Sequence, residues 1–222
     1  MNEYSLELSV APVARPYLLD DYKIFKNIPG SKSSVDMDNK HFEMYLNVAT
    51  DKVESYLQRK LIEQTWILRL DKFPTGQRSY TPQGYSGTQI PYGKLISITD
   101  PINVYGSDGT VSDTLLIADN DYEYDNNSEP AVLIFNRTPA PGKKLKGIEI
   151  TYKVGYGTSY KDVPESIRMA IMAWASAMTM NKVNPAALFN KQKGAGGRSS
   201  SGEIPEDVLA YLSGYQVNLI DD

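Results

Sequence analysis

Apolar positions along the chain follow a helical period in two separate segments. The first segment runs from Asp38 to Lys60, and the second starts after Pro164. Apolar side chains spaced by three and four residues lie on one face of a helix, so each segment predicts an amphipathic helix. The first stripe comprises Phe42, Leu46, Ala49, Val53 and Leu57, and the second Ile167, Ala170, Ile171, Trp174, Ala177 and Met178.

Between these helices the pattern changes to short runs rich in β-branched and aromatic residues, which are typical of strands. Proline, glycine and aspartate separate the runs and indicate turns. The expected strands are residues 64–70, 95–99, 102–105, 114–117, 131–136 and 148–154. We therefore predict an α+β fold, a small helical bundle with an inserted antiparallel β subdomain, in which the two apolar stripes pack on each other.

Weaker patterns lie at the two ends of the chain. Residues 1–15 are expected to form an extended arm, and Pro16 opens a short helix that ends at Pro29. The segment 191–202, KQKGAGGRSSSG, has the composition of a flexible linker. A short helix with one apolar face follows it. The predicted divisions are 1–64 (arm and first helices), 65–157 (β subdomain), 158–190 (closing helix), 191–202 (linker) and 203–222 (C-terminal docking segment).

Composition removes several classes of protein. Cysteine is absent, which excludes disulfides and thiolate metal sites. The net charge of -4 argues against a protein that grips nucleic acid over its whole surface. Val154-Gly155-Tyr156-Gly157 is the core of the potassium-channel filter motif, but the uncharged stretch that follows, 169–181, is shorter than the roughly 20 residues of a spanning helix. No secretory signal is recognisable at Met1, so we expect synthesis in the cytosol and no membrane association.

The sequence contains fragments of nucleotide-binding and calcium-binding motifs, but each lacks residues that its function requires. Gly155-Tyr156-Gly157 follows a strand and precedes a helix, but a dinucleotide loop needs a third glycine where Tyr160 stands. We interpret it as a strand exit in which glycine permits a positive φ. The glycines of 191–202 lack the Lys-Ser or Lys-Thr pair of a P-loop, and the acidic run 119–127 lacks the glycine of an EF-hand, so we expect a solvated loop there. With His41 as the only histidine, we predict no catalytic residue, metal site or cofactor.

Several short sequence motifs follow one another in a fixed order along most of the chain. The first is a Pro-x-x-Leu helix with a lysine four residues on, here Pro16, Leu19 and Lys23. The others comprise Glu54, Tyr56, Arg59, Leu61, Ile62, Gln64, Thr65 and Trp66, then Leu70 with Phe73-Pro74, then Tyr152, Gly155, Tyr156, Gly157, Val163 and Pro164, and finally Ile204-Pro205, Val208 and Tyr211-Leu212. In this order the motifs resemble those of the head–tail adaptor (head–tail connector) proteins of tailed bacteriophages and gene transfer agents. The chain departs from the pattern in its longer β region and its less basic C-terminal segment.

This resemblance implies a structural protein of the virion neck, with no enzymatic activity, assembled in the host cytoplasm. Copies would form a homo-oligomeric ring, typically a dodecamer, beneath the portal protein. The ring would receive the stopper or tail-completion protein, and genomic DNA would pass through its lumen without sequence-specific binding. An acidic balance suits that passage, because many lysine–phosphate contacts would retard DNA exit.

The sequence assigns residues to two roles and leaves one alternative open. The helical core is expected to comprise Phe42, Leu46, Val53, Leu57, Ile167, Ile171, Trp174 and Met178. Portal docking is expected to use Ile204, Val208, Leu209, Leu212, Tyr215, Val217 and Leu219, because an apolar helix on a tether can reach a groove on a neighbour. In a second interpretation this helix folds back on its own bundle. The alternative function is a phage-associated module whose tyrosine-rich β subdomain binds a glycan or peptide.

Overall fold

The computed structural model describes residues 4–28, 35–74, 87–111, 115–180 and 204–216. The chain forms two compact units, and each is made of segments that are distant in sequence. Unit 1 comprises Met1–Val13, Gln58–Thr158 and Val217–Asp222, and unit 2 comprises Ala14–Leu57 and Ser159–Gln216. The predicted linker, 191–202, lies outside the described residues.

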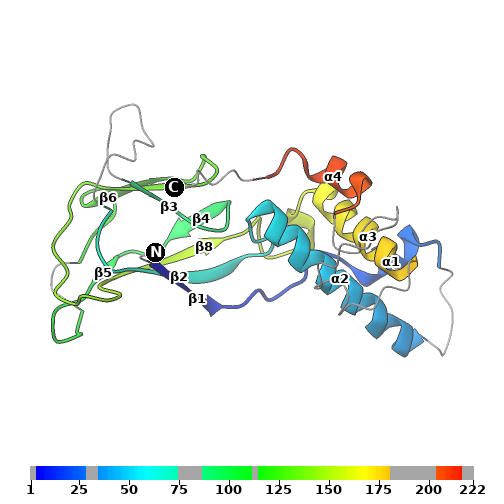
Figure 1. The fold of residues 1–222 in the computed structure, drawn as a ribbon, viewed down its shortest axis with the longest axis horizontal. Coiled ribbons are helices and arrows are strands. Elements are labelled where there is room, and N and C mark those ends of the chain that lie inside the picture. The colour runs from blue at the N-terminus through cyan, green and yellow to red at the C-terminus, as the bar shows by residue number, and fades with distance from the viewer. Residues whose placement is uncertain (1–3, 29–34, 75–86, 112–114, 181–203, 217–222) are drawn as a thin grey trace, which may run out of the picture. The chain divides into compact units, whose positions relative to one another are not determined.

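Among its described residues, unit 1 contains two antiparallel sheets, so the chain is a mixed α+β protein. The larger sheet has the strand order β1-β2-β8-β4, with β5 pairing with β8 beside β4, and the smaller sheet has the order β3-β7-β6 (Figure 1). The bounds of the strands are β1 Tyr4–Val10, β2 Gln64–Leu70, β3 Gly87–Gln89, β4 Leu95–Ile98, β5 Asn103–Val104, β6 Tyr122–Asp125, β7 Val132–Phe135 and β8 Ile148–Val154.

The core of unit 1 lies between apolar faces of these strands. Along β8 buried and half-buried residues alternate strictly, which places Ile148, Ile150, Tyr152 and Val154 on the inner face. Leu68 of β2 and Leu133 of β7 belong to the same apolar cluster. Both predicted strands with the strongest β-branched runs, β2 and β8, therefore form the centre of the sheet.

Unit 2 contains helices α1 Leu19–Phe25, α2 Val35–Leu57, α3 Glu165–Met180 and α4 Glu206–Leu212. A short 3-10 helix, Tyr160–Asp162, comes just before α3 in the chain. Helix α3 contacts both α2 and α4 (Figure 1). Polar contacts tie α1 to α3, because Lys26 Nζ donates to Ser176 Oγ at 3.1 Å and to Thr179 Oγ1 at 3.2 Å. Helix α2 ends where Gln58 adopts a positive φ of 53°.

Three segments differ from the sequence expectation. The expected arm holds a strand, since β1 pairs with β2 over its length. Part of the acidic run is also a strand, β6, with Tyr122 buried and Glu123 and Asp125 facing solvent. In the expected strand 114–117, the described residues form only an isolated bridge between Leu116 and Ile102.

Candidate interaction surfaces

The two longest motif phrases meet at one place in unit 1, around Arg59. The Arg59 side chain is 3% exposed; its Nη1 donates to Tyr156 Oη at 2.8 Å and its Nη2 to Glu129 Oε2 at 2.7 Å. The guanidinium carbon also lies 5.7 Å from the centre of the Tyr156 ring. Gly93 makes room for this side chain, because a Cβ on Gly93 would lie 2.5 Å from Arg59 Cβ. The two hydrogen bonds offset part of the loss of water, while the buried Nε of Arg59 has no hydrogen-bond partner among the described residues.

Backbone contacts complete this Arg59 junction. Glu63 N donates to Gly157 O at 2.8 Å, and Tyr156 N donates to Leu61 O at 3.1 Å. Gly155 has a φ of 127°, and a Cβ there would lie 2.7 Å from the backbone of Ile62 and Glu63. The Gly155 position is therefore a strand exit that requires glycine, as we predicted from the sequence. The junction holds the segment that enters unit 1 after α2 beside the segment that leaves it after β8.

Aromatic and basic side chains gather next to the junction. The Trp66 and Tyr92 rings lie 4.6 Å apart, and Lys60 Nζ lies 5.2 Å from the centre of the Tyr92 ring. Lys94 Nζ lies 5.3 Å from the Tyr156 ring. Half-buried tryptophan and tyrosine are the residue types that protein interfaces favour.

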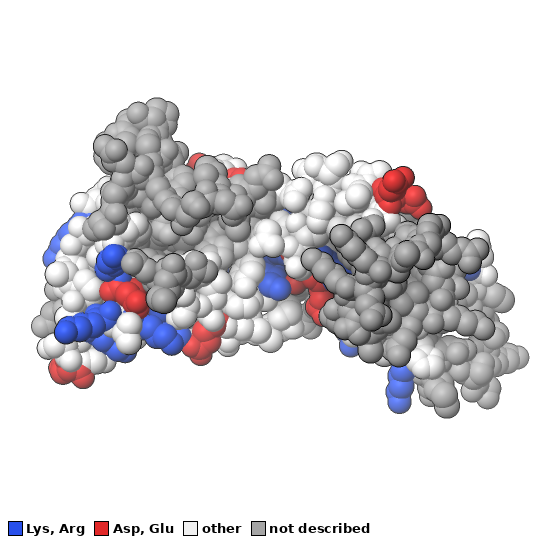
Figure 2. Space-filling view, in the orientation of Figure 1, with Lys and Arg blue, Asp and Glu red and all other residues white. Residues whose placement is uncertain are grey.

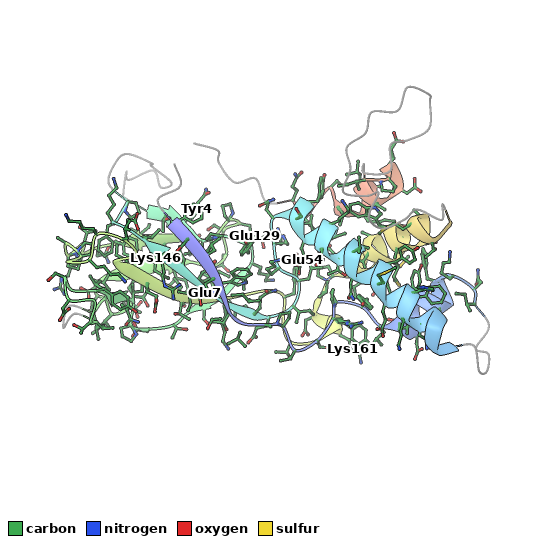
Figure 3. All side chains as sticks on the ribbon, turned by 60° about the horizontal axis from the view of Figure 1, so that its bottom comes forward. Tyr4, Glu7, Glu54, Glu129, Lys146 and Lys161 are labelled. Atoms are coloured by element: carbon green, nitrogen blue, oxygen red, sulfur yellow. The ribbon has the colours of Figure 1, made fainter. Side chains whose placement is uncertain are left out.

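An ion-pair network crosses the larger sheet at its β1 side. Arg69 of β2 pairs with Glu7 of β1 and, at 2.8 Å, with Glu149 of β8. The hydrogen bond and charge of Arg69 hold the pKa of Glu7 below its ordinary value, and Lys146 adds to this effect. Figure 3 shows Tyr4 and Glu7 along β1, with Lys146 also labelled. The network joins three adjacent strands and helps to fix their register.

The other candidate chemistry gives no site. A depression of about 480 Å³ is lined by Asp119, Glu123, Tyr124 and Asn126. Within the described ranges no three His, Cys, Asp or Glu side chains gather as metal ligands. None of the described helices combines the length and apolarity that crossing a membrane requires. On the face drawn in Figure 2, acidic and basic side chains of the described residues are interspersed.

The residues assigned to the helical core lie in unit 2. Leu46, Val53, Leu57, Ile167, Ile171, Trp174 and Met178 are all buried. Phe42 is half-buried, and its ring meets Tyr22 edge-to-face at 5.6 Å. The sequence stripe missed Tyr17 and Tyr22, which are also buried there. Tyr17 Oη donates to Asn47 Oδ1 at 2.8 Å, so its polar end remains satisfied.

The residues assigned to portal docking fall into three groups. Val208 and Leu212 are buried, and α4 contacts α3, so the apolar face of this helix is covered within its own unit. Ile204, Leu209 and Tyr215 are half-buried. Val217 and Leu219 lie outside the described residues. This packing corresponds to the second interpretation, in which the helix folds back on its own bundle. Contact with α3 removes the apolar face of α4 from water, which is favourable.

Comparison with solved structures identifies the fold. A chain in a structure described as "Virion of native gene transfer agent (GTA) particle" has a TM-score of 0.67 and 14% sequence identity, over 97% of both chains. A chain in "Neck of empty GTA particle computed with C6 symmetry" gives 0.67 and 13%, over 98% of this chain and 97% of that one. A chain in "Neck of native GTA particle computed with C12 symmetry" gives 0.60 and 15%, over 97% of both.

These matches cover nearly the whole chain, so this protein has the fold of chains found in gene transfer agent particles and their necks. At such sequence identity the likeness concerns the fold. No protein-family model matches the sequence, and no curated protein matches it.

Proposed function

We propose that this protein is a structural component of the neck of a tailed-phage-like particle, where it acts as the head–tail adaptor. The observation that carries the proposal is the fold, shared over 97% of both chains with a chain of a gene transfer agent neck. The order of the sequence phrases supports it independently. The Arg59 junction adds a structural reason for two of those phrases, because Arg59 and Tyr156 bind each other.

In this proposal, copies of the chain form a closed ring, and the function of the ring is adhesion between faces rather than catalysis. The two neck structures, computed with C6 and C12 symmetry, support a homo-oligomeric ring, and both symmetries are consistent with twelve copies. The portal protein would lie on one side of the ring and the stopper or tail-completion protein on the other. Genomic DNA would pass through the lumen, and a chain with a net charge of -4 would bind it weakly.

The portal-docking role of the C-terminal segment remains part of the proposal in a narrower form. Val208 and Leu212 are occupied against α3, so they are not available to a portal while α4 stays packed. Contact would instead involve Ile204, Leu209 and Tyr215, together with Val217 and Leu219 beyond the described residues.

Microscopy of particles tests the function. Particles from cells that produce this protein with a small C-terminal tag, bound by a gold-labelled antibody, should carry the label at the neck. A matched strain with the same tag on a tail-tube protein serves as the control for accessibility.

Deletion of the gene should yield DNA-filled heads without tails. Tailed particles in the deletion strain, or a label elsewhere than the neck, would contradict the proposal. Glycan binding by the purified monomer would favour the alternative module.

A further inference from the structure

Strand β1 leaves an apolar edge on the larger sheet of unit 1. In the described part of the chain, the strand path of this sheet ends at β1 on one side and at β4 on the other. Tyr4, Leu8 and Val10 are 47%, 43% and 54% exposed, although all three lie within this one strand. Natural edge strands are usually short, charged or covered, because unpaired backbone groups can bind another strand. An apolar edge of seven residues is therefore suited to strand addition.

The geometry of β1 defines which part of it can accept a strand. Pairing with β2 is regular from Tyr4 to Leu8 and shifts by a bulge before Val10. The one charged side chain of β1, Glu7, is engaged with Arg69, so it does not offer a free charge that repels a partner. Leu8 lies opposite Trp66, whose ring contacts that of Tyr92 in a tilted arrangement. A strand added beside β1 would cover the exposed half of Leu8 and extend this aromatic surface.

Strand directions determine what can be added. The pairs β1–β2, β2–β8 and β4–β8 are all antiparallel, so β1 and β4 run in opposite directions at opposite edges. Two copies related by rotation about an axis along the strands therefore bring β4 of one copy antiparallel to β1 of the next. Such a contact joins two different faces of the same chain, which is what a closed cyclic ring requires.

We propose that β1 of each copy pairs with β4 of its neighbour, so that the larger sheets form one continuous antiparallel belt around the ring. The inference rests on the proposed function for the existence of a ring. The occupant of the β1 edge is thus a second copy of this chain. Ile96 and Ser97 of β4, at the opposite end of the strand path, are half-buried and therefore retain some accessible surface.

The faces of the sheet supply a sharp test. Ser5 lies opposite Arg69 and Glu7 opposite Ile67, while Ser97 lies opposite Lys153, which is itself opposite Thr65. Because alternate residues of β2 share a face, Ser5, Glu7 and Ser97 all lie on the polar face. Leu8 lies on the other face, opposite Trp66. A continuous sheet brings together only positions on the same face.

The experiment uses the absence of cysteine from the full chain. Ser97→Cys is combined with Ser5→Cys, with Glu7→Cys, or with Leu8→Cys as the opposite-face control, and each variant is assembled into particles. A short bifunctional thiol reagent is added to the necks. We expect a ladder of multimers for at least one of the two polar-face pairs, at least tenfold more intense than for the Leu8 pair or for any single-cysteine variant.

The outcomes separate the two proposals. Dimers from Glu7→Cys alone, whose side chain is the more exposed of the two, would indicate β1–β1 pairing about a twofold axis, and this would overturn the belt. Variants that are present in the neck but form no ladder with either polar-face pair would overturn the belt and leave the neck function intact. Absence of the unmodified chain from the neck would overturn the function and the belt together.

Discussion

At the scale of single residues, Arg59 connects parts of the chain that are far apart in sequence. Its guanidinium binds Tyr156 and Glu129, which lie 97 and 70 residues away. The sequence phrase that contains Arg59 could be recognised, but its partner could not be predicted. A guanidinium can donate hydrogen bonds to any carboxylate or hydroxyl oxygen within reach, so only the folded chain decides which ones it meets.

Replacing Arg59 should destabilise unit 1. Arg59→Met removes both hydrogen bonds and leaves Glu129 without its partner. Because the Glu129 side chain is 39% exposed, water compensates in part. We therefore expect the free energy of unfolding to fall by about 2–3 kcal/mol, which is below the range for a fully buried pair. Urea unfolding would measure it. Arg137→Met is the matched control, since that side chain is 54% exposed and pairs with Asp121 at 3.5 Å, and it should cost less than about 1 kcal/mol. Equal losses for the two variants would show that the Arg59 junction contributes no special stability.

At the scale of elements, the alternation of side chains explains both a success and a miss. The β-branched runs of β2 and β8 predicted both strands with their observed bounds. The same period of two is present in Tyr4, Leu6, Leu8 and Val10, with Ser5, Glu7 and Ser9 between them, yet we predicted an arm there. A seven-residue segment with polar residues at alternate positions can be an unpaired arm or a strand. Pairing with β2 makes this segment a strand.

The Glu7–Arg69 pair should make the attachment of β1 depend on pH. Because the pKa of Glu7 is lower in the folded chain than in the unfolded chain, the pair stabilises the fold above the ordinary glutamate range. This stabilisation is lost as the pH falls through the lowered pKa. Amide hydrogen exchange should therefore show that protection of residues 4–10 decreases on acidification from pH 6 to pH 3, relative to β8. Glu7→Gln should lower protection at pH 6 and flatten the dependence. An unchanged pH profile in Glu7→Gln would assign the effect to another group.

Helix α4 allows a test of whether it belongs to unit 2 in the free chain. Leu212 is fully buried, so Leu212→Ala should reduce the free energy of unfolding by about 2–4 kcal/mol. Tyr211, the preceding residue, is 40% exposed, and Tyr211→Ala should change it by only about 0.5 kcal/mol. Chemical denaturation of the isolated chain would compare the two. If Leu212→Ala had the stability of the unmodified chain, α4 would not be packed on α3 in solution, and Val208 and Leu212 would again be candidates for portal docking.

At the scale of the whole molecule, the sequence predicted two kinds of structure but not the complete membership of each unit. The change of period at Gln64 and Gly157 predicted an inserted β region of residues 65–157, and the segment Gln58–Thr158 belongs to unit 1 together with Met1–Val13. The contribution of residues 1–13 to unit 1 could not be inferred, because it depends on a strand pairing across more than fifty residues of intervening helix and loop. Local patterns determine elements, whereas long-range pairing determines which unit they join.

The position of β1 at the start of the chain also determines when the larger sheet can form during synthesis. The ribosome releases residues 4–10 early, but β2 begins only at Gln64, so at typical rates of synthesis the partner appears roughly 3–10 seconds later. Strand β8, the centre of the sheet, ends at Val154 and emerges later still. During this interval Tyr4, Leu6, Leu8 and Val10 form an apolar segment with no strand to bind. The pairing of β1 can therefore form only after β2 has been translated, and the larger sheet is complete only after β8 has followed.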